Sequence, residues 1–258
     1  MAIHAVNRAA PVPGSSALVL GAGTVGLLTA AMARQAGCST VIIADVDDGR
    51  VDYAISKGFA THGYVVPKPL HSSPSSSSIF TGSSGTSTPL EAGVMTPSSS
   101  LAFSNQLDSA KMLAAEMLSL TKSDSSFYMD DEDDGVDVTF ECTGKEVCMH
   151  TSLYATKSGG KVIMVGMGTP IQTLPLSVAH LREIDILGIF RYANTYATGI
   201  KLLNAQHRGG PAGFTLPALD DMVTHRFKGL DNAKGAFELA SRTSDDDGNL
   251  VLKVVIEA

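Results

Sequence analysis

The 258-residue sequence has few cysteines, no long apolar run and no excess of basic residues, and each absence excludes a class of protein. Its 19 Lys and Arg residues are outnumbered by 26 Asp and Glu, and the net charge of −7 argues against a nucleic acid or an anionic membrane as partner. No apolar run approaches the roughly 18 residues that a membrane-spanning helix needs. The first residues have neither a basic leader nor a long apolar core, so they do not read as a secretory signal.

The three cysteines, Cys38, Cys142 and Cys148, form no C-x-x-C pair. An odd and sparse set of this kind suits a reducing compartment, so we expect a cytoplasmic protein. The apolar fraction of 44% is enough to bury a sizeable core, in one large domain or two small ones.

Residues 17–26 carry the most informative pattern, a short apolar run followed by a G-x-G-x-x-G motif. Gly21 can take the tight turn, Gly23 leaves room for a pyrophosphate to approach the backbone, and Gly26 lets the following helix lie close to the strand. A helical pattern follows over residues 25–36, so strand, turn and helix come in the order of a dinucleotide-binding unit. The alternative is an ordinary strand–turn–helix that carries three glycines.

The free N–H groups near Thr24, Val25 and Gly26 are expected to point at the anion. A second apolar strand over residues 41–44 ends on Asp45, 19 residues after Gly26, close to the roughly 20 expected for the acid that binds the adenosine ribose. The Asp45 carboxylate can accept both ribose hydroxyls and would repel a 2′-phosphate, which favours NAD over NADP. A helix N-cap is the alternative role for Asp45.

Arg50 complicates the choice of coenzyme, because an arginine near this position can receive the 2′-phosphate of NADP. Asp45, Asp47 and Asp48 surround it in the sequence, and we expect their negative field to dominate. We therefore predict NAD and include Arg50 among the coenzyme-binding residues. NADP-linked reduction with Arg50 as the phosphate partner is the alternative.

Strand and helix patterns alternate along the rest of the chain. Expected helices cover residues 3–9, 48–57, 109–120, 145–156 and 195–204, and expected strands cover 62–66, 136–140, 161–165, 185–190 and 250–256. Such alternation predicts an α/β fold, a doubly wound (Rossmann) parallel sheet with helices on both faces.

Two stretches interrupt this alternation. Serine dominates residues 68–108, which cannot bury enough surface to offset their ordering entropy, so we expect a disordered insertion there. Residues 123–134 end in an acidic run, read as an exposed acidic loop or, alternatively, as a metal or protein-docking site.

Further candidate residues follow the fourth and fifth expected strands of the sheet. Thr143 and Gly144 end the Glu-Cys-Thr-Gly string after the fourth strand, and the fifth strand ends in Val165, Gly166 and Met167, at the same carboxyl edge. This edge forms the ligand crevice of a doubly wound sheet, and its glycines allow a flat nicotinamide ring to lie against the backbone. Simple turn glycines are the alternative.

These motifs resemble the coenzyme-binding half of the zinc-dependent medium-chain alcohol dehydrogenases, most closely their polyol branch of sorbitol, xylitol and arabinitol dehydrogenases. The matching strings are at residues 3–5, 21–26, 141–144, 159–166, 182–195 and 223–227. The resemblance implies NAD-dependent hydride transfer involving a small polyol or secondary alcohol. It also implies that Phe190 contacts the nicotinamide end and that Arg191 and Tyr192 bind substrate hydroxyls, with an ion pair as the alternative role for Arg191.

Members of that family carry a further small domain ahead of this region, which supplies Cys, His and Glu ligands to a catalytic zinc. None of the seven histidines here has a Cys or Glu partner in that spacing, so we expect no metal site and no catalytic residue, and His225 to be a packing residue. We expect a truncated protein that is weakly active or inactive alone. The expected parts are a helix leading in from the missing domain (1–13), the NAD-binding domain (14–67 and 109–214), the insertion (68–108) and a returning C-terminal segment (215–258).

The resemblance also implies that the C-terminal segment folds onto the missing domain. The helix at residues 3–9 and the strand at residues 250–256 would then lack a partner surface, so we expect a homo-oligomer or aggregation. A second hypothesis is a non-catalytic NAD-binding module regulated through its insertion. Ser73-Pro74, Thr88-Pro89 and Thr96-Pro97 are minimal proline-directed phosphorylation sites there, and added phosphates would place negative charge near the adenine end.

Overall fold

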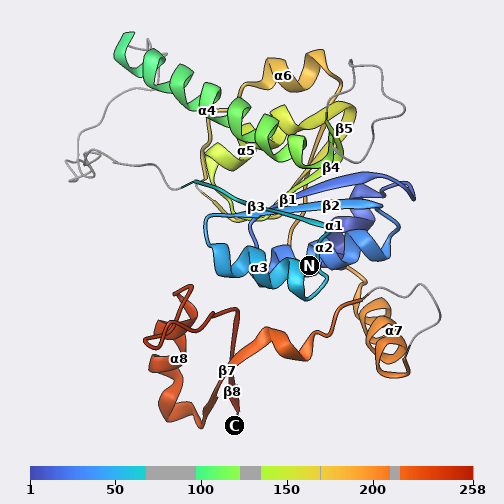
Figure 1. Ribbon diagram of the computed structural model, residues 1–258, viewed down its shortest axis with the longest axis vertical. Coiled ribbons are helices and arrows are strands. Elements are labelled where there is room, and N and C mark those ends of the chain that lie inside the picture. The colour runs from blue at the N-terminus through green and yellow to red at the C-terminus, as the bar shows by residue number, and fades with distance from the viewer. Residues whose placement is uncertain (68–96, 123–134, 169, 210–215, 258) are drawn as a thin grey trace, which may run out of the picture.

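The computed structural model describes residues 1–67, 97–122, 135–168, 170–209 and 216–257 (Figure 1). Its main feature is a six-stranded parallel sheet in the order β3-β2-β1-β4-β5-β6. The strands are β1 (Ser16–Leu20), β2 (Thr40–Asp45), β3 (His62–Val65), β4 (Val136–Glu141), β5 (Thr156–Met164) and β6 (Asp185–Gly188). The strand order reverses between β1 and β4, which is where ligands bind in doubly wound folds.

Helices cover both faces of this sheet (Figure 1). On one face lie α1 (Ala2–Ala9), α2 (Thr24–Gln35) and α3 (Asp48–Ser56), and on the other lie α4 (Pro97–Lys122), α5 (Glu146–Ala155) and α6 (Leu176–Leu181). The predicted doubly wound fold is therefore confirmed. The inner strands are buried almost throughout, as expected for a parallel sheet covered on both sides.

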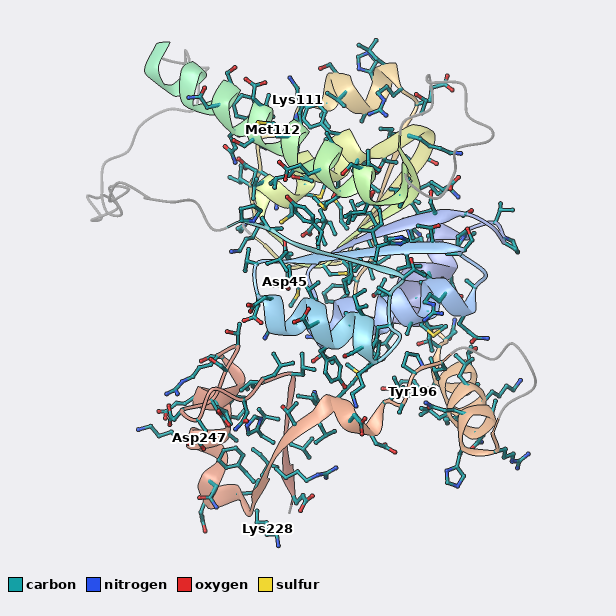
Figure 2. The ribbon with its side chains drawn as sticks, in the orientation of Figure 1. Asp45, Lys111, Met112, Tyr196, Lys228 and Asp247 are labelled. Carbon is teal, nitrogen blue, oxygen red and sulfur yellow. The ribbon has the colours of Figure 1, made fainter. Side chains whose placement is uncertain are left out.

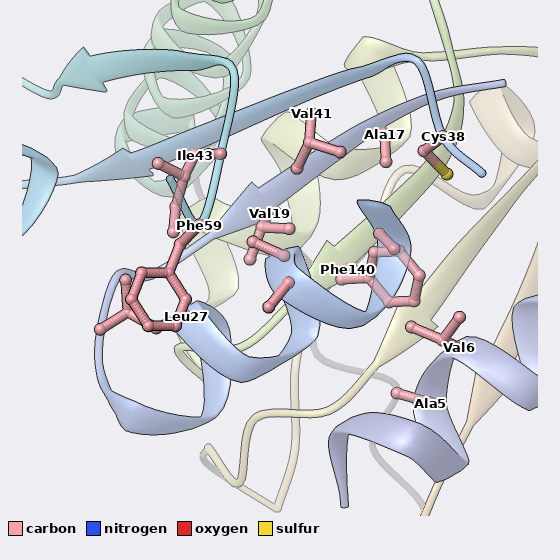
Figure 3. Close-up of a cluster of buried hydrophobic side chains, with 14 of the residues drawn as sticks. Ala5, Val6, Ala17, Val19, Leu27, Cys38, Val41, Ile43, Phe59 and Phe140 are labelled. Carbon is pink, nitrogen blue, oxygen red and sulfur yellow. The ribbon is translucent and has the colours of Figure 1, made fainter. Parts of the chain in front are cut away.

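The first helix is a packed part of the core, contrary to the expectation that it would lack a partner surface. Ala5, Val6 and Ala9 join the largest apolar cluster, together with Phe140 of β4 (Figure 3). The Lys161 ammonium also donates to the carbonyl of Ala9 at 2.9 Å. This packing follows from the spacing of the small apolar residues, which places them on one face of the helix.

Helix α4 begins at Pro97, so residues 97–108 are helical rather than part of a disordered insertion. Ala110, Ala114 and Met117 of this helix are buried, and Ala114 and Met117 pack in an apolar cluster with residues of β1 and β2. The remainder of the expected insertion, residues 68–96, and the acidic stretch 123–134 lie outside the described residues, as do Ser73, Thr88 and Thr96.

The C-terminal part holds helix α7 (Tyr196–His207) and a small unit made of β7 (Val223–Lys228), α8 (Ala233–Ala240) and β8 (Lys253–Glu257). Strands β7 and β8 pair in parallel, and α8 packs against β8. In the described part of the chain, no helix is both long enough and apolar enough to cross a membrane.

Candidate functional site

The turn between β1 and α2 brings together the three glycines of the sequence motif. Gly21 has a φ of +98°, a conformation that glycine adopts without strain. A Cβ on Gly26 would lie 1.8 Å from the carbonyl oxygen of Gly21, so the helix approaches the strand closely enough to require glycine at position 26. A Cβ on Gly23 would meet only the Arg50 guanidinium, at 3.9 Å. The roles predicted for Gly21 and Gly26 thus match the observed geometry.

Helix α2 begins at this turn with backbone donors that no side chain caps. Gly23 is its N-cap residue and supplies no side-chain hydrogen bond, and the first backbone bond of the helix runs from Leu27 N to Gly23 O. The N–H groups of Thr24, Val25 and Gly26 therefore precede the hydrogen-bonded ladder of the helix. Donors in this position, at the positive end of a helix dipole, suit a phosphate group.

Asp45 lies at the end of β2 beside the glycine turn (Figure 2). Its Oδ2 accepts from Ala22 N at 2.6 Å and its Oδ1 from Asp47 N at 3.0 Å, and each oxygen keeps a further lone pair for a hydroxyl. The N-cap of α3 is Asp47, whose carboxylate accepts from Arg50 N at 3.0 Å. The alternative role of Asp45 as a helix cap is therefore wrong.

The C-terminal segment borders the same turn. Arg50 donates from Nη2 to the carbonyl of Val251 at 3.2 Å, and its Nε is buried without a hydrogen-bond partner among the described residues. Thr24 donates from its hydroxyl to the carbonyl of Leu252 at 2.9 Å. Two residues predicted to bind the coenzyme are thus also held by a segment more than 200 positions away in sequence.

The loops after the carboxyl ends of β4 and β5 contact each other through Gly144, Gly166 and Gly168, which together form a glycine floor. A Cβ on Gly166 would lie 2.1 Å from Gly144 N, and one on Gly168 would lie 1.6 Å from Gly144 O. The methyl group of Thr143 faces the glycine turn, because a Cβ on Gly21 would lie 2.9 Å from it. The two loops at the switch point are therefore in direct contact.

The side chains of Thr143 and Val165 are occupied within the protein. The Thr143 hydroxyl donates to Glu141 and accepts from Lys145 N at 3.0 Å. Val165 is 5% exposed and packs in the core. These two residues would therefore meet a ligand through backbone atoms, whereas Met167, at 81% exposure, presents its side chain.

Phe190, Arg191 and Tyr192 follow β6 at the same edge of the sheet. The guanidinium of Arg191 lies 5.5 Å from the centroid of the Phe190 ring, and the Phe190 side chain is 73% exposed. Tyr192 accepts a hydrogen bond from the Tyr196 hydroxyl at 3.1 Å. This set offers an aromatic face, a cation and phenolic oxygens on one exposed surface.

No cluster of metal-ligating side chains occurs in the ranges that the structure describes. His225 instead pairs its Nε2 with Asp245 at 3.2 Å. The thiols offer no nucleophile either: burial raises the pKa of Cys38 to about 11 and raises the pKa of both Cys142 and Cys148. The described residues therefore supply binding groups but no metal-based or thiol-based reaction centre.

A six-stranded parallel sheet of this order, with a glycine turn at the switch point, defines the class of Rossmann-fold proteins. Within that class, the chain is a relative of the zinc-dependent dehydrogenases, and a family model described as zinc-binding dehydrogenase matches residues 101–205. Sorbitol dehydrogenase of Mus musculus is 32% identical over 240 residues, or 93% of this chain and 50% of that protein. The predicted resemblance to the polyol branch is thereby confirmed.

Two solved structures share the fold. The 2R,3R-butanediol dehydrogenase of Bacillus subtilis gives a TM-score of 0.64 at 18% identity, over 100% of this chain and 55% of that one. A zinc-binding dehydrogenase of Sinorhizobium meliloti 1021 bound to NADP gives 0.64 at 20% identity, over 100% of this chain and 56% of that one. The chain spans about half the length of the curated relatives it matches, such as the 50% of the mouse enzyme.

Sequence reasoning missed two parts of the site. Glu141 was noted only within a matching string, although its side chain organises the turn that holds Thr143. The contacts of Val251 and Leu252 with the glycine turn were also missed. In the sequence, the signal for Glu141 was an acidic residue at the end of an otherwise apolar strand. No local pattern marked Val251 or Leu252.

Proposed function

We propose that this chain binds NAD across the switch point of its sheet and forms the coenzyme-binding part of an oxidoreductase. That enzyme would transfer hydride between the nicotinamide and a small polyol or secondary alcohol. The main support is the joint placement of uncapped N–H donors at the start of α2 and the Asp45 carboxylate, which accepts from Ala22 within the same turn at 2.6 Å. The sorbitol dehydrogenase relatives support the reaction class.

Each end of the coenzyme would meet a different part of this surface. The pyrophosphate would lie on the N–H groups of Thr24, Val25 and Gly26, and the adenosine ribose on Asp45. The nicotinamide would lie against the glycine floor formed by residues 144, 166 and 168, with Phe190 alongside. Arg191 and Tyr192 would bind substrate hydroxyls, because a guanidinium offers several fixed donors to a polyol.

The preference for NAD depends on which charge faces the 2′ position of the ribose. Asp45 keeps free lone pairs that suit hydroxyl donors and repel a phosphate. Arg50 already donates to the Val251 carbonyl at 3.2 Å, so a 2′-phosphate would have to compete for its guanidinium. The carboxylate therefore decides the selectivity in this arrangement.

Calorimetric titration of the purified chain with NADH and with NADPH tests the proposal. NADH should bind more tightly than NADPH, and Asp45→Ala should weaken NADH about tenfold or more by removing hydrogen bonds to a charged acceptor. Asp185→Ala removes an exposed carboxylate at the amino end of β6, on the opposite edge of the sheet, and should leave both affinities unchanged. Tighter NADPH binding by the unaltered chain would reverse the coenzyme assignment, and no binding of either would refute the function.

Zinc enters only through the family, since the described residues hold no ligand set that fits it. A zinc-bound alcohol has a lowered pKa, which is the chemistry such a metal supplies. We propose that turnover by this chain alone is weak or absent. Sorbitol with NAD, assayed with and without added zinc, should give no NADH above the blank.

A further inference from the structure

Glu141, the last residue of β4, carries a carboxylate that is buried where its neighbours are apolar. The side chain is 2% exposed, and its partners in register are Leu20 of β1 and Met164 of β5. Burying a carboxylate costs far more than burying either of those side chains unless several donors satisfy it. An acid in this row of the sheet therefore needs a local explanation.

The donors to Glu141 all come from the turn that follows β4. Its Oε1 accepts from Thr143 N at 2.7 Å, from the Thr143 hydroxyl and from Gly144 N at 2.9 Å, and its Oε2 also lies 2.9 Å from Gly144 N. An ionised carboxylate only accepts hydrogen bonds, so it fits a position that is approached by several donors and no acceptor. The side chain thus fixes the height of this turn above the end of the strand.

The backbone of Glu141 holds the facing loop as well. Its carbonyl oxygen accepts from Val165 N and from Gly166 N, both at 2.8 Å. Gly144 and Gly166 are in such close contact that a Cβ on the latter would lie 2.1 Å from Gly144 N. One residue therefore sets the positions of both halves of the glycine floor.

We propose that Glu141 is the positioning residue for the nicotinamide half of the coenzyme. Its carboxylate holds the Thr143–Gly144 turn against Gly166, which keeps the floor flat where the ring would lie. Within the described residues the Glu141 carboxylate accepts no hydrogen bond from the turn at Gly21–Gly26, which meets Thr143 through a methyl contact, so the adenosine half should depend on Glu141 much less than the nicotinamide half. This inference rests on the proposed function, because it assumes that a nicotinamide dinucleotide is the ligand.

The test measures the affinity of Glu141→Gln for NADH and for ADP-ribose, which lacks the nicotinamide. The amide cannot accept with both of its polar atoms, so the turn should lose its fixed position. NADH affinity should fall about tenfold, while ADP-ribose affinity should stay within about twofold. Asp137→Asn is the matched control. Asp137 lies near the start of the same strand, at the opposite edge of the sheet, and its carboxylate accepts from Ser16 N and Oγ at 2.7 and 2.8 Å. It should leave both affinities unchanged.

The outcomes separate the two proposals. Equal losses for NADH and ADP-ribose in Glu141→Gln, or no loss for either, would overturn the positioning role. Failure of the unaltered chain to bind both ligands would instead refute the proposed function. If thermal denaturation shows that Glu141→Gln does not fold, Thr143→Val carries the same comparison, because it removes one donor to Glu141. Thr151→Val is the control for it, because it removes a buried hydroxyl that donates to the carbonyl of Val147 within α5 at 2.9 Å, and it must bind both ligands as the unaltered chain does.

Discussion

At the scale of single residues, Gly26 allows no side chain. Because its Cβ would lie 1.8 Å from the Gly21 carbonyl oxygen, Gly26→Ala must push α2 away from the turn. We expect unfolding by urea to show a loss of about 1–3 kcal/mol, as overpacking of a tight contact produces. NADH binding should be lost as well, since the donors of residues 24–26 move with the helix.

The control for this change is Gly188→Ala at the end of β6, where a Cβ would meet nothing within 4 Å. Its stability should stay within about 0.5 kcal/mol of the unaltered chain. If Gly26→Ala proved as stable as Gly188→Ala, the close approach of helix and strand described here would be incorrect.

The residues that the sequence predicted are those whose role follows from local spacing. Gly21, Gly26 and Asp45 could be placed because a strand, a turn and a helix fix them relative to one another along the chain. The role of Glu141 could not, because it depends on how an irregular turn folds back onto the strand end. The contact of Thr24 with Leu252 joins positions 228 apart, and no local pattern encodes such a pairing.

At the scale of elements, a side-chain hydrogen bond from Tyr64 to Glu116 ties β3 to α4. Burial, and after it this hydrogen bond, raises the pKa of Tyr64 from 10.0 to about 12. The folded state thus favours the neutral phenol. The stabilisation is fully present below about pH 10, the ordinary pKa, and is lost as the pH rises through about 12.

Tyr64→Phe should therefore lower the free energy of unfolding by up to about 1 kcal/mol at neutral pH, a small value because the pair is partly exposed. The difference in free energy of unfolding between Tyr64→Phe and the unaltered chain should vanish as the pH approaches the raised pKa of Tyr64. Urea unfolding across the alkaline range measures it, and Glu116→Gln should bring the ionisation of Tyr64 to lower pH. A difference that persists above the raised pKa would contradict this account.

Most helices and strands matched the periodic patterns. The patterns did not predict α6, β7 or α8, and they predicted only residues 109–120 of α4. Its start at Pro97 lies within serine-rich sequence, in which serine competes for backbone hydrogen bonds and weakens any helical prediction. Packing of Ala114 and Met117 on the sheet stabilises the helix, and composition does not reveal that contact.

At the scale of the whole molecule, the C-terminal part packs on the side of the sheet that carries α2 and α3 (Figure 1). Lys57 of α3 forms an ion pair with Asp221 at 2.7 Å, and Met222, 4% exposed, joins the largest apolar cluster. Together with the bond from Thr24 to Leu252, these contacts give the segment a docking surface on this chain. The returning segment therefore packs on this chain, and the structure offers a further basis for self-association.

That basis is helix α7, which buries none of its residues against the described part of the chain. Tyr196, Ile200 and Leu203 are 69, 58 and 50% exposed, and their spacing puts them on one face of the helix. An uncovered apolar stripe of this kind favours association with another copy, so light scattering should report a species larger than a monomer. Replacing Ile200 and Leu203 by lysine should shift it toward the monomer, whereas Val12→Lys, at a single exposed apolar residue, should not. A monomer at every concentration of the unaltered chain would contradict the prediction.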